Sequence, residues 1–321
     1  MIDMKQDSFF YKLTHRNLFK VFKNRLINKY FIGKYHFIKK DFSEYHIDDI
    51  NQTLTVIEEQ GKSISRFGDG EFKWIQMKYQ DSFQAPDLGL SKRLAEVLKS
   101  DSRYCMIALP DAFSGMSQFT RDGKNGWRMI MARDVYPILP LLDKKHRYGN
   151  ANISRPYMDF SDKNAAKTTF KQFKRIWAHR NLLIVEGSKS RLGIGNDLFS
   201  GSQSIQRILC PEVNAWSVYA KIKAMTVNYA QKIDNPLVII ALGPTATVLA
   251  YDLSEVGIQA LDLGHIDIEY EWMNKHYLKK HAIPGKYVNE APTEGGRSVS
   301  ADIQSDTYHS EILVRISSDE K

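Results

Sequence analysis

The sequence predicts an α/β protein built around a Rossmann-like, mostly parallel, doubly wound sheet, with a basic helical extension at its N-terminus. From residue 47 onward, short runs of β-branched and aliphatic residues alternate with segments of helical periodicity, as in a parallel sheet covered by helices. Glycine-containing loops follow several of these runs, where such folds bind their ligands. A length of 321 residues with 43% hydrophobic residues is enough for a large core and excludes a fibrous or wholly disordered chain.

The predicted strands and helices alternate along the chain. Seven runs have the composition of buried strands: residues 63–67, 104–109, 150–154, 181–187, 236–243, 258–264 and, near the C-terminus, 311–316. Helices are expected over residues 48–60, 90–100, 127–139, 162–179, 203–231 with a break near Pro211, and 245–256. The helix after Ser161, its expected N-cap, has one apolar face formed by Ala166, Phe170, Phe173 and Trp177. Gly257 is expected to end the last of these helices.

Charge and composition divide the chain into three expected parts. These are a basic amphipathic extension over residues 1–44, an α/β domain over 45–284, and a polar tail over 285–321 that contains the short final strand. Residues 1–40 contain ten Lys and Arg against two Asp, which accounts for the whole net charge of +8. The remainder of the chain is therefore neutral. A neutral body with one basic arm indicates a local electrostatic role and argues against nucleic acid as a partner.

The arm itself predicts an amphipathic helix, because Leu18, Phe22, Leu26 and Tyr30 recur every four residues. Two interpretations remain open: peripheral contact of residues 1–40 with an anionic membrane, or a helix packed on the body of the protein. No stretch reaches the roughly eighteen apolar residues of a membrane span, and the arm lacks the apolar core of a signal peptide. Two cysteines form no disulfide framework. We expect a cytoplasmic protein, at most peripheral at the inner face of the cell membrane.

A carboxylate pair follows the first long strand. Asp69 and Glu71 flank Gly70 in the turn after residues 63–67, and glycines there allow the backbone to approach a ligand closely. Two converging carboxylates favour a hard divalent cation that keeps water and substrate oxygens as its other ligands. The alternative is an acidic turn at the start of a helix.

Two further loops have the composition of a nucleotide site. The segment 186–199 combines glycines with Arg191, Asn196 and Asp197, which suit phosphate, ribose or base edges. The turn Gly243-Pro244-Thr245 joins a strand to a helix, where free N–H groups and the helix dipole favour an anion. A surface loop and a tight turn with Thr245 as N-cap are the respective alternatives.

The segment after the last expected strand of the domain carries His265 and Asp267 among several acidic residues. Its spacing matches no zinc-protease or EF-hand motif. His265 is a candidate base or metal ligand, or else a structural histidine with satisfied hydrogen bonds.

Taken in order, long motifs of this chain resemble the bacterial GT-D fold glycosyltransferases: SRFGDGEF, YGNANISRPYMDF, IVEGSKSRLGIGNDLF, SIQRILCP and ALGPTATVLAYDLSEVGIQALDLGHIDIEYEW. The resemblance covers about residues 45–282. It implies transfer of a hexose from a nucleotide sugar such as UDP-glucose to a glycan, glycoprotein or lipid-linked saccharide in surface glycan synthesis. Asp69 and Glu71 resemble the family's DxE motif, which implies a Mn²⁺ or Mg²⁺ ion.

The resemblance and the loop chemistry together assign residues to roles. The expected donor-binding residues are Arg66, Arg191, Asn196, Asp197, Gly243, Pro244 and Thr245. His265 and Asp267 are the candidates for the base that accepts the proton of the acceptor hydroxyl, a step that contributes roughly 10²- to 10⁴-fold. Two other classes remain: a Rossmann-type methyltransferase, which would bind S-adenosylmethionine without metal, and a non-catalytic scaffold at a membrane surface.

Overall fold

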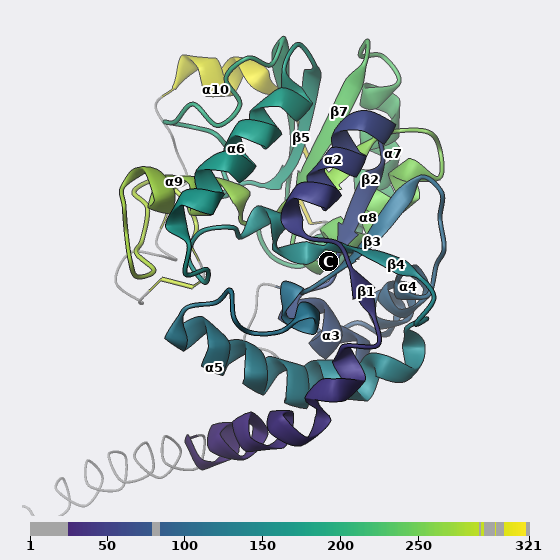
Figure 1. Cartoon of the computed structure of the whole chain (residues 1–321). Coiled ribbons are helices and arrows are strands. Elements are labelled where there is room, and N and C mark those ends of the chain that lie inside the picture. The colour runs from purple at the N-terminus through teal and green to yellow at the C-terminus, as the bar shows by residue number, and fades with distance from the viewer. Residues whose placement is uncertain (1–24, 79–83, 289, 292–298, 300–304, 319–321) are drawn as a thin grey trace, which may run out of the picture.

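The computed structural model describes residues 25–78, 84–288, 290–291, 299 and 305–318. Within these residues nine strands form one sheet in the order β1-β4-β3-β2-β8-β7-β5-β6-β9. Every strand pairing is parallel, and helices lie on both faces of the sheet (Figure 1). The predicted doubly wound α/β fold is confirmed.

The elements have the following bounds. The strands are β1 His46–Ile47, β2 Ser63–Arg66, β3 Cys105–Leu109, β4 Arg147–Asn150, β5 Asn181–Gly187, β6 Ser204–Cys210, β7 Pro236–Ala241, β8 Ala260–Asp262 and β9 Ile312–Arg315. The helices are residues 25–42, α2 Ile50–Gln60, α3 Asp69–Ile75, α4 Leu88–Leu98, α5 Arg121–Ile130, α6 Lys163–Trp177, α7 Tyr219–Ala230, α8 Pro244–Ser254, α9 Ile266–Asn274 and α10 Asp306–Glu311.

The central strands are buried along nearly their whole length and are mostly apolar, because both faces of the sheet are covered. One core lies beneath α2, α6 and α9, where Ala166, Phe170, Phe173 and Trp177 all point inward as predicted. The cores of the opposite face lie beneath α3, α4, α7 and α8. Helix α6 starts one residue later than expected, because Asp162 and not Ser161 accepts hydrogen bonds from the first free N–H groups. Gly257, at φ 79°, ends α8 as predicted.

Two predicted elements were wrong. Residues 204–210 form strand β6 and not the start of a helix; β6 pairs with both β5 and β9, so tertiary pairing overrides the helical periodicity of SIQRILC. Residues 151–154 form a 3₁₀ turn and not a strand, because the Asn150 side chain accepts the N–H of Asn152 and ends β4. The helix expected over 127–139 begins at Arg121 and continues past Ile130 as a π turn and a 3₁₀ turn.

The described part of the N-terminal arm is a helix over residues 25–42 that packs through its own apolar face. Tyr35 and Phe42 are buried, and Phe31 and Ile38 pack against the same core. This helix runs beneath α5 in Figure 1. Of the predicted stripe, Leu26 and Tyr30 are 51% and 65% exposed, and Leu18 and Phe22 lie outside the described residues. No helix in the described ranges has the length and apolar character needed to cross a membrane.

The C-terminal segment contributes to the body of the fold. The predicted short strand is confirmed as β9, which extends the sheet at β6. Lys286 and Val288 are buried, and the carbonyl of Gly285 accepts a 2.8 Å hydrogen bond from Arg191. Residues beyond 284 therefore help to hold the loops at the carboxyl ends of the strands.

Candidate active site

Two adjoining cavities open at the carboxyl ends of the strands. The larger has a volume of about 870 Å³ and lies beyond β2, β4 and β8, whereas the smaller, of about 210 Å³, lies beyond β5, β6 and β7. Gly243, Gly264 and His265 line both cavities. A ligand could therefore extend from one to the other past these three residues, at the edge of the sheet where doubly wound folds bind ligands.

The predicted carboxylate pair lies in the larger cavity. Asp69 and Glu71 belong to the first turn of α3, and both line the cavity wall. The Glu71 carboxylate accepts the N–H of Gly68 at 2.8 Å, while Asp69, whose side chain is 50% exposed, pairs with Lys73 at 2.6 Å. Burial, and next the negative charge of Asp262, raise the pKa of Glu71 to about 7.

This donor set fits a divalent cation. Burial and the negative charge of Asp262 disfavour the charged form of Glu71. A bound cation would favour that charged form and so offset both effects. No group of three or more candidate ligands occurs among the described residues. Two protein carboxylates would leave the remaining positions for water or substrate phosphate, as Mg²⁺ and similar ions prefer.

Arg66 is fixed at the floor of the same cavity by Asp262. Its guanidinium donates to a carboxylate oxygen of Asp262 at 2.9 Å and to the carbonyl of Ala151 at 3.3 Å, and its backbone N–H donates to the same carboxylate. Gly264 leaves room for this arginine, since a Cβ there would come within 2.9 Å of the guanidinium. Arg66 thus faces the cavity with a fixed orientation.

The turn Gly243-Pro244-Thr245 starts α8 between the two cavities. Gly243 has φ 55°, a conformation that favours glycine, and Pro244 occupies the first helical position. The hydroxyl of Thr245 is buried and has no hydrogen-bond partner among the described residues. Free N–H groups at this eleven-residue helix favour an anion at the junction of the cavities.

His265 lies at the same junction. Its Nε2 is buried and, within the described part of the chain, makes no hydrogen bond; the nearest carboxylate, Glu290, is 3.8 Å away. Burial lowers the pKa of His265 to about 3, and the positive charge of Arg155 contributes. The imidazole is therefore neutral at physiological pH, and its Nε2 has no hydrogen-bond partner among the described residues.

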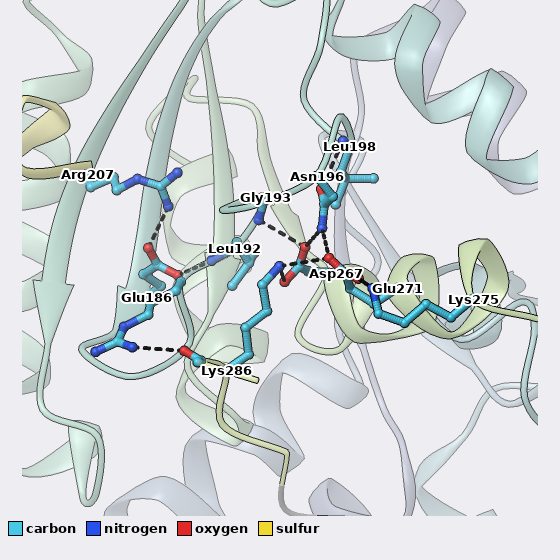
Figure 2. A network of polar contacts seen from close by, with 12 residues as sticks. Glu186, Leu192, Gly193, Asn196, Leu198, Arg207, Asp267, Glu271, Lys275 and Lys286 are labelled. Atoms are coloured by element: carbon cyan, nitrogen blue, oxygen red, sulfur yellow. Dashed lines mark hydrogen bonds and ion pairs between the residues drawn. The ribbon is translucent and has the colours of Figure 1, made fainter. Parts of the chain in front are cut away.

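Asp267 anchors the predicted nucleotide loop (Figure 2). One oxygen accepts the N–H of Gly193 at 3.0 Å and the Asn196 amide at 2.8 Å, and the other accepts Lys286 at 2.6 Å. With three donors bound and 2% exposure, the carboxylate holds the loop in place. Glu186 fixes the start of the loop by accepting the N–H of Leu192.

The predicted loop residues divide between the cavity and the exterior. Lys189, Ser190 and Leu192 line the smaller cavity. Asn196 instead bonds Asp267 and Glu271, and Asp197 pairs with Lys174 on the surface. Arg191 is buried and donates to the carbonyl of Gly285. The cavity lining therefore does not include three of the predicted residues, which instead bond to the residues that hold the loop in place: Arg191, Asn196 and Asp197.

Sequence reasoning missed a cluster of charged residues in the larger cavity. Arg155 and Lys280 each lie 2.5 Å from Glu290, and all three line the cavity. These cations hold the pKa of Glu290 well below its usual range despite its burial. Arg155 stands in the quoted motif YGNANISRPYMDF, but Lys280 and Glu290 come from a polar segment with no motif, and only the fold brings them together.

An all-parallel sheet with a polar cavity at the carboxyl ends of its strands is the arrangement in which open α/β proteins bind their ligands. The glycosyltransferase GT-D fold family matches residues 64–291. The chain belongs to this GT-D fold glycosyltransferase family.

The similar proteins agree. GlyD, a glycosyltransferase of Streptococcus pneumoniae, is 38% identical over 293 residues, which are 87% of this chain and 34% of GlyD. A "Probable glycosyl transferase Gly" of Streptococcus gordonii is 40% identical over 242 residues, 75% of this chain and 35% of that protein. The chain spans about a third of the length of these curated relatives.

Solved structures match nearly end to end. One, described as a new glycosyltransferase (DUF1792) from Streptococcus sanguinis, has a TM-score of 0.78 at 36% identity and covers 85% of this chain and 99% of its own. Another, described as domain of unknown function 1792 with a distinct glycosyltransferase fold, has a TM-score of 0.81 at 34% identity and covers 88% of this chain and 99% of its own.

Proposed function

We propose that the protein transfers a hexose from a nucleotide sugar, such as UDP-glucose, to a hydroxyl of a saccharide, glycoprotein or lipid-linked acceptor, with the help of Mn²⁺ or Mg²⁺. The observation that carries this proposal is the junction of two cavities at Gly243, Gly264 and His265, with the carboxylates Asp69 and Glu71 on one side only. A nucleotide sugar has the matching order of parts: nucleoside, diphosphate, sugar.

The smaller cavity suits the nucleoside. Its lining includes the apolar side chains of Leu192, Val213 and Ile268 beside the polar Lys189 and Ser190, the mixture typical of small-molecule sites. The diphosphate would then cross Gly243 at the start of α8, where free N–H groups favour an anion. The hexose would enter the larger cavity.

A divalent ion held by Asp69 and Glu71 would stabilise the charge that develops on the leaving phosphate. Arg66 faces the same space with its guanidinium fixed by Asp262. In the tautomer that carries its proton on Nδ1, the neutral His265 can accept a hydrogen bond from the acceptor hydroxyl at Nε2, which has no partner among the described residues. Donor phosphates beside it would raise its pKa, the direction that a general base requires. Asp267 serves this chemistry indirectly, by holding the loop.

Thermal-shift measurements test the proposal. We expect UDP and Mn²⁺ together to raise the melting temperature more than either does alone, since Asp69 and Glu71 bind only one side of the ion. UDP-glucose should behave like UDP and release UDP slowly in water. A shift with S-adenosylmethionine but none with UDP and Mn²⁺ would replace the proposal with the methyltransferase.

A further inference from the structure

One wall of the larger cavity is formed by a single helix, α5. Asp122, Gly123, Gly126, Trp127 and Ile130 all line the cavity, and their spacing puts them on one helical face. None of the motifs that suggested metal or nucleotide chemistry includes this helix. The wall is therefore left over once the metal carboxylates and the donor loops are accounted for.

Gly126 leaves open space on this wall. A Cβ added there would meet no atom within 4 Å, whereas a Cβ on Gly123 would come within 2.8 Å of the Asp159 carbonyl oxygen. Packing thus explains Gly123 but not Gly126. Only proline is less favourable than glycine in a helix interior, so Gly126 weakens α5 without a packing reason while keeping part of the cavity empty.

Trp127, the next residue, offers an unused donor. Its side chain is 8% exposed, and its ring stacks on Phe119 with 5.9 Å between ring centroids. Its Nε1 is buried and finds no hydrogen-bond partner in the ranges that the structure describes. An indole N–H can only donate, and a buried donor without a partner is costly. A ligand oxygen would satisfy this donor if binding uncovered Nε1, which has almost no exposed surface in the structure.

We propose that this wall, centred on Gly126 and Trp127, is the subsite for an uncharged acceptor saccharide; the inference rests on the proposed glycosyl transfer. Hydroxyl groups of a sugar both donate and accept, so they match the indole N–H of Trp127 and the carboxylate of Asp122. Asp122 and Asp159 carry negative charge in the cavity lining, and the nearby cations Arg155 and Lys280 are already paired with Glu290. A phosphorylated sugar is therefore disfavoured at this wall. Gly126 supplies the space that the sugar ring occupies.

The test is to fill that space. Gly126→Leu adds a side chain at a position where a Cβ meets no atom within 4 Å. Gly33→Leu is a matched control, because Gly33 is also helical and equally open but does not line the cavity. Binding of p-nitrophenyl glucoside, galactoside and N-acetylglucosaminide is followed by saturation-transfer NMR without donor. UDP release from UDP-glucose and Mn²⁺ is measured with and without each glycoside.

We expect Gly126→Leu to lose glycoside binding and at least tenfold of the glycoside-stimulated UDP release, while its melting temperature and its shift with UDP and Mn²⁺ match those of Gly33→Leu. Unchanged glycoside binding would overturn the subsite, as would loss of the UDP shift, which would assign Gly126 to the donor. Failure of all three glycosides to bind the wild-type protein also counts against it. The proposed function fails separately, if the wild-type protein shows no shift with UDP and Mn²⁺.

Discussion

The ammonium group of Lys286 lies 2.6 Å from the carboxylate of Asp267, and both side chains are almost completely buried. Lys286 comes from the segment that follows α9, and Asp267 from the first turn of that helix. Because Asp267 also holds Gly193 and Asn196, this ion pair connects the C-terminal part of the chain to the loop beside the smaller cavity. The geometry of the smaller cavity therefore depends on Lys286, which does not line it.

Removing the charge of either carboxylate of the proposed metal site, Asp69 or Glu71, should reduce turnover. Asp69→Asn and Glu71→Gln change little in shape, so each is expected to lower the kcat of sugar transfer at least tenfold, equivalent to about 1.4 kcal/mol of lost transition-state stabilisation. The melting temperature without ligands should stay within a few degrees of wild type. Near-wild-type turnover in both variants at saturating Mn²⁺ would contradict the metal assignment.

His265 should affect the chemical step more than donor binding. His265→Ala is expected to lower kcat by roughly 10²- to 10⁴-fold, the usual contribution of a positioned base. His265→Gln separates two roles, because an amide oxygen accepts a hydrogen bond but does not take the proton. We expect the UDP and Mn²⁺ thermal shift to persist in both variants, and a glutamine variant with wild-type kcat would rule out proton transfer.

Breaking the Asp267–Lys286 pair should loosen the donor loop. Asp267→Asn leaves the buried Lys286 with only the more distant carboxylate of Glu271, at 3.5 Å, as its counter-charge. We expect a loss of up to about 3 kcal/mol of stability, and the donor KM should rise more than kcat falls. Asp197→Asn is the matched control, because its ion pair with Lys174 involves a side chain that is 66% exposed and contributes at most about 1 kcal/mol. Urea unfolding and UDP titration compare the two variants. Equal effects would contradict the anchoring role of Asp267.

Glu269 should make stability fall as pH rises. Its carboxylate accepts the N–H groups of Tyr157 and Met158 at 2.9 Å, and burial raises its pKa from 4.5 to about 7. The folded state thus holds a proton that the unfolded state releases, so the contribution is complete below pH 4.5 and is lost as pH passes about 7. At about 1.4 kcal/mol per pKa unit, the total is about 3 kcal/mol.

The measurement is the unfolding free energy of wild type minus that of Glu269→Gln at pH 5 and pH 8. Glutamine keeps an acceptor for the two N–H groups but carries no charge at either pH. We expect the difference to decrease between the two pH values, and the exposed Glu59→Gln gives the baseline. A difference that is constant or grows with pH would show that the pKa of Glu269 is not raised in the folded state.

Substitutions on the two faces of helix 25–42 should have different effects on stability. Phe42 is fully buried and Phe37 is 88% exposed. Phe42→Ala is expected to cost about 3 to 5 kcal/mol of stability, whereas Phe37→Ser should leave stability unchanged. Co-sedimentation with phosphatidylserine vesicles at low and high salt tests the proposed membrane contact, which Phe37→Ser should weaken. Absence of vesicle binding at low salt would leave the helix a packing element.

Periodicity predicted most of the fold because the central strands are buried on both faces. β7 reads as a continuous apolar run and β5 as one with a polar residue near each end, and their first residues match the prediction. The sequence did not predict β6 as a strand, because its first three residues are exposed or half-buried and the rest are buried. This pattern resembles one face of an amphipathic helix. β1 has only two residues, too few for any pattern, and exists because β4 lies beside it.

The site was partly predictable, because topology determines which loops meet and side-chain contacts determine their roles. Asp69, Glu71, Gly243 and His265 follow strand ends and line the cavities as that rule implies. Asn196 and Asp197 have equally suitable chemistry but bond to α9 and α6 side chains. Trp127 lies on a helix whose sequence has no ligand motif, so its unused N–H is visible only once Phe119 and the cavity are in place.

Helix α5 lies between helix 25–42 and the larger cavity. Tyr35, on helix 25–42, shares a core with Trp127, and the Arg128 guanidinium of α5 opposes the rise in the pKa of Tyr35 that burial causes. The same helix faces the cavity through Gly126. Helix 25–42 therefore packs against the side of α5 that lies away from Gly126, and so supports the helix that forms this wall of the cavity.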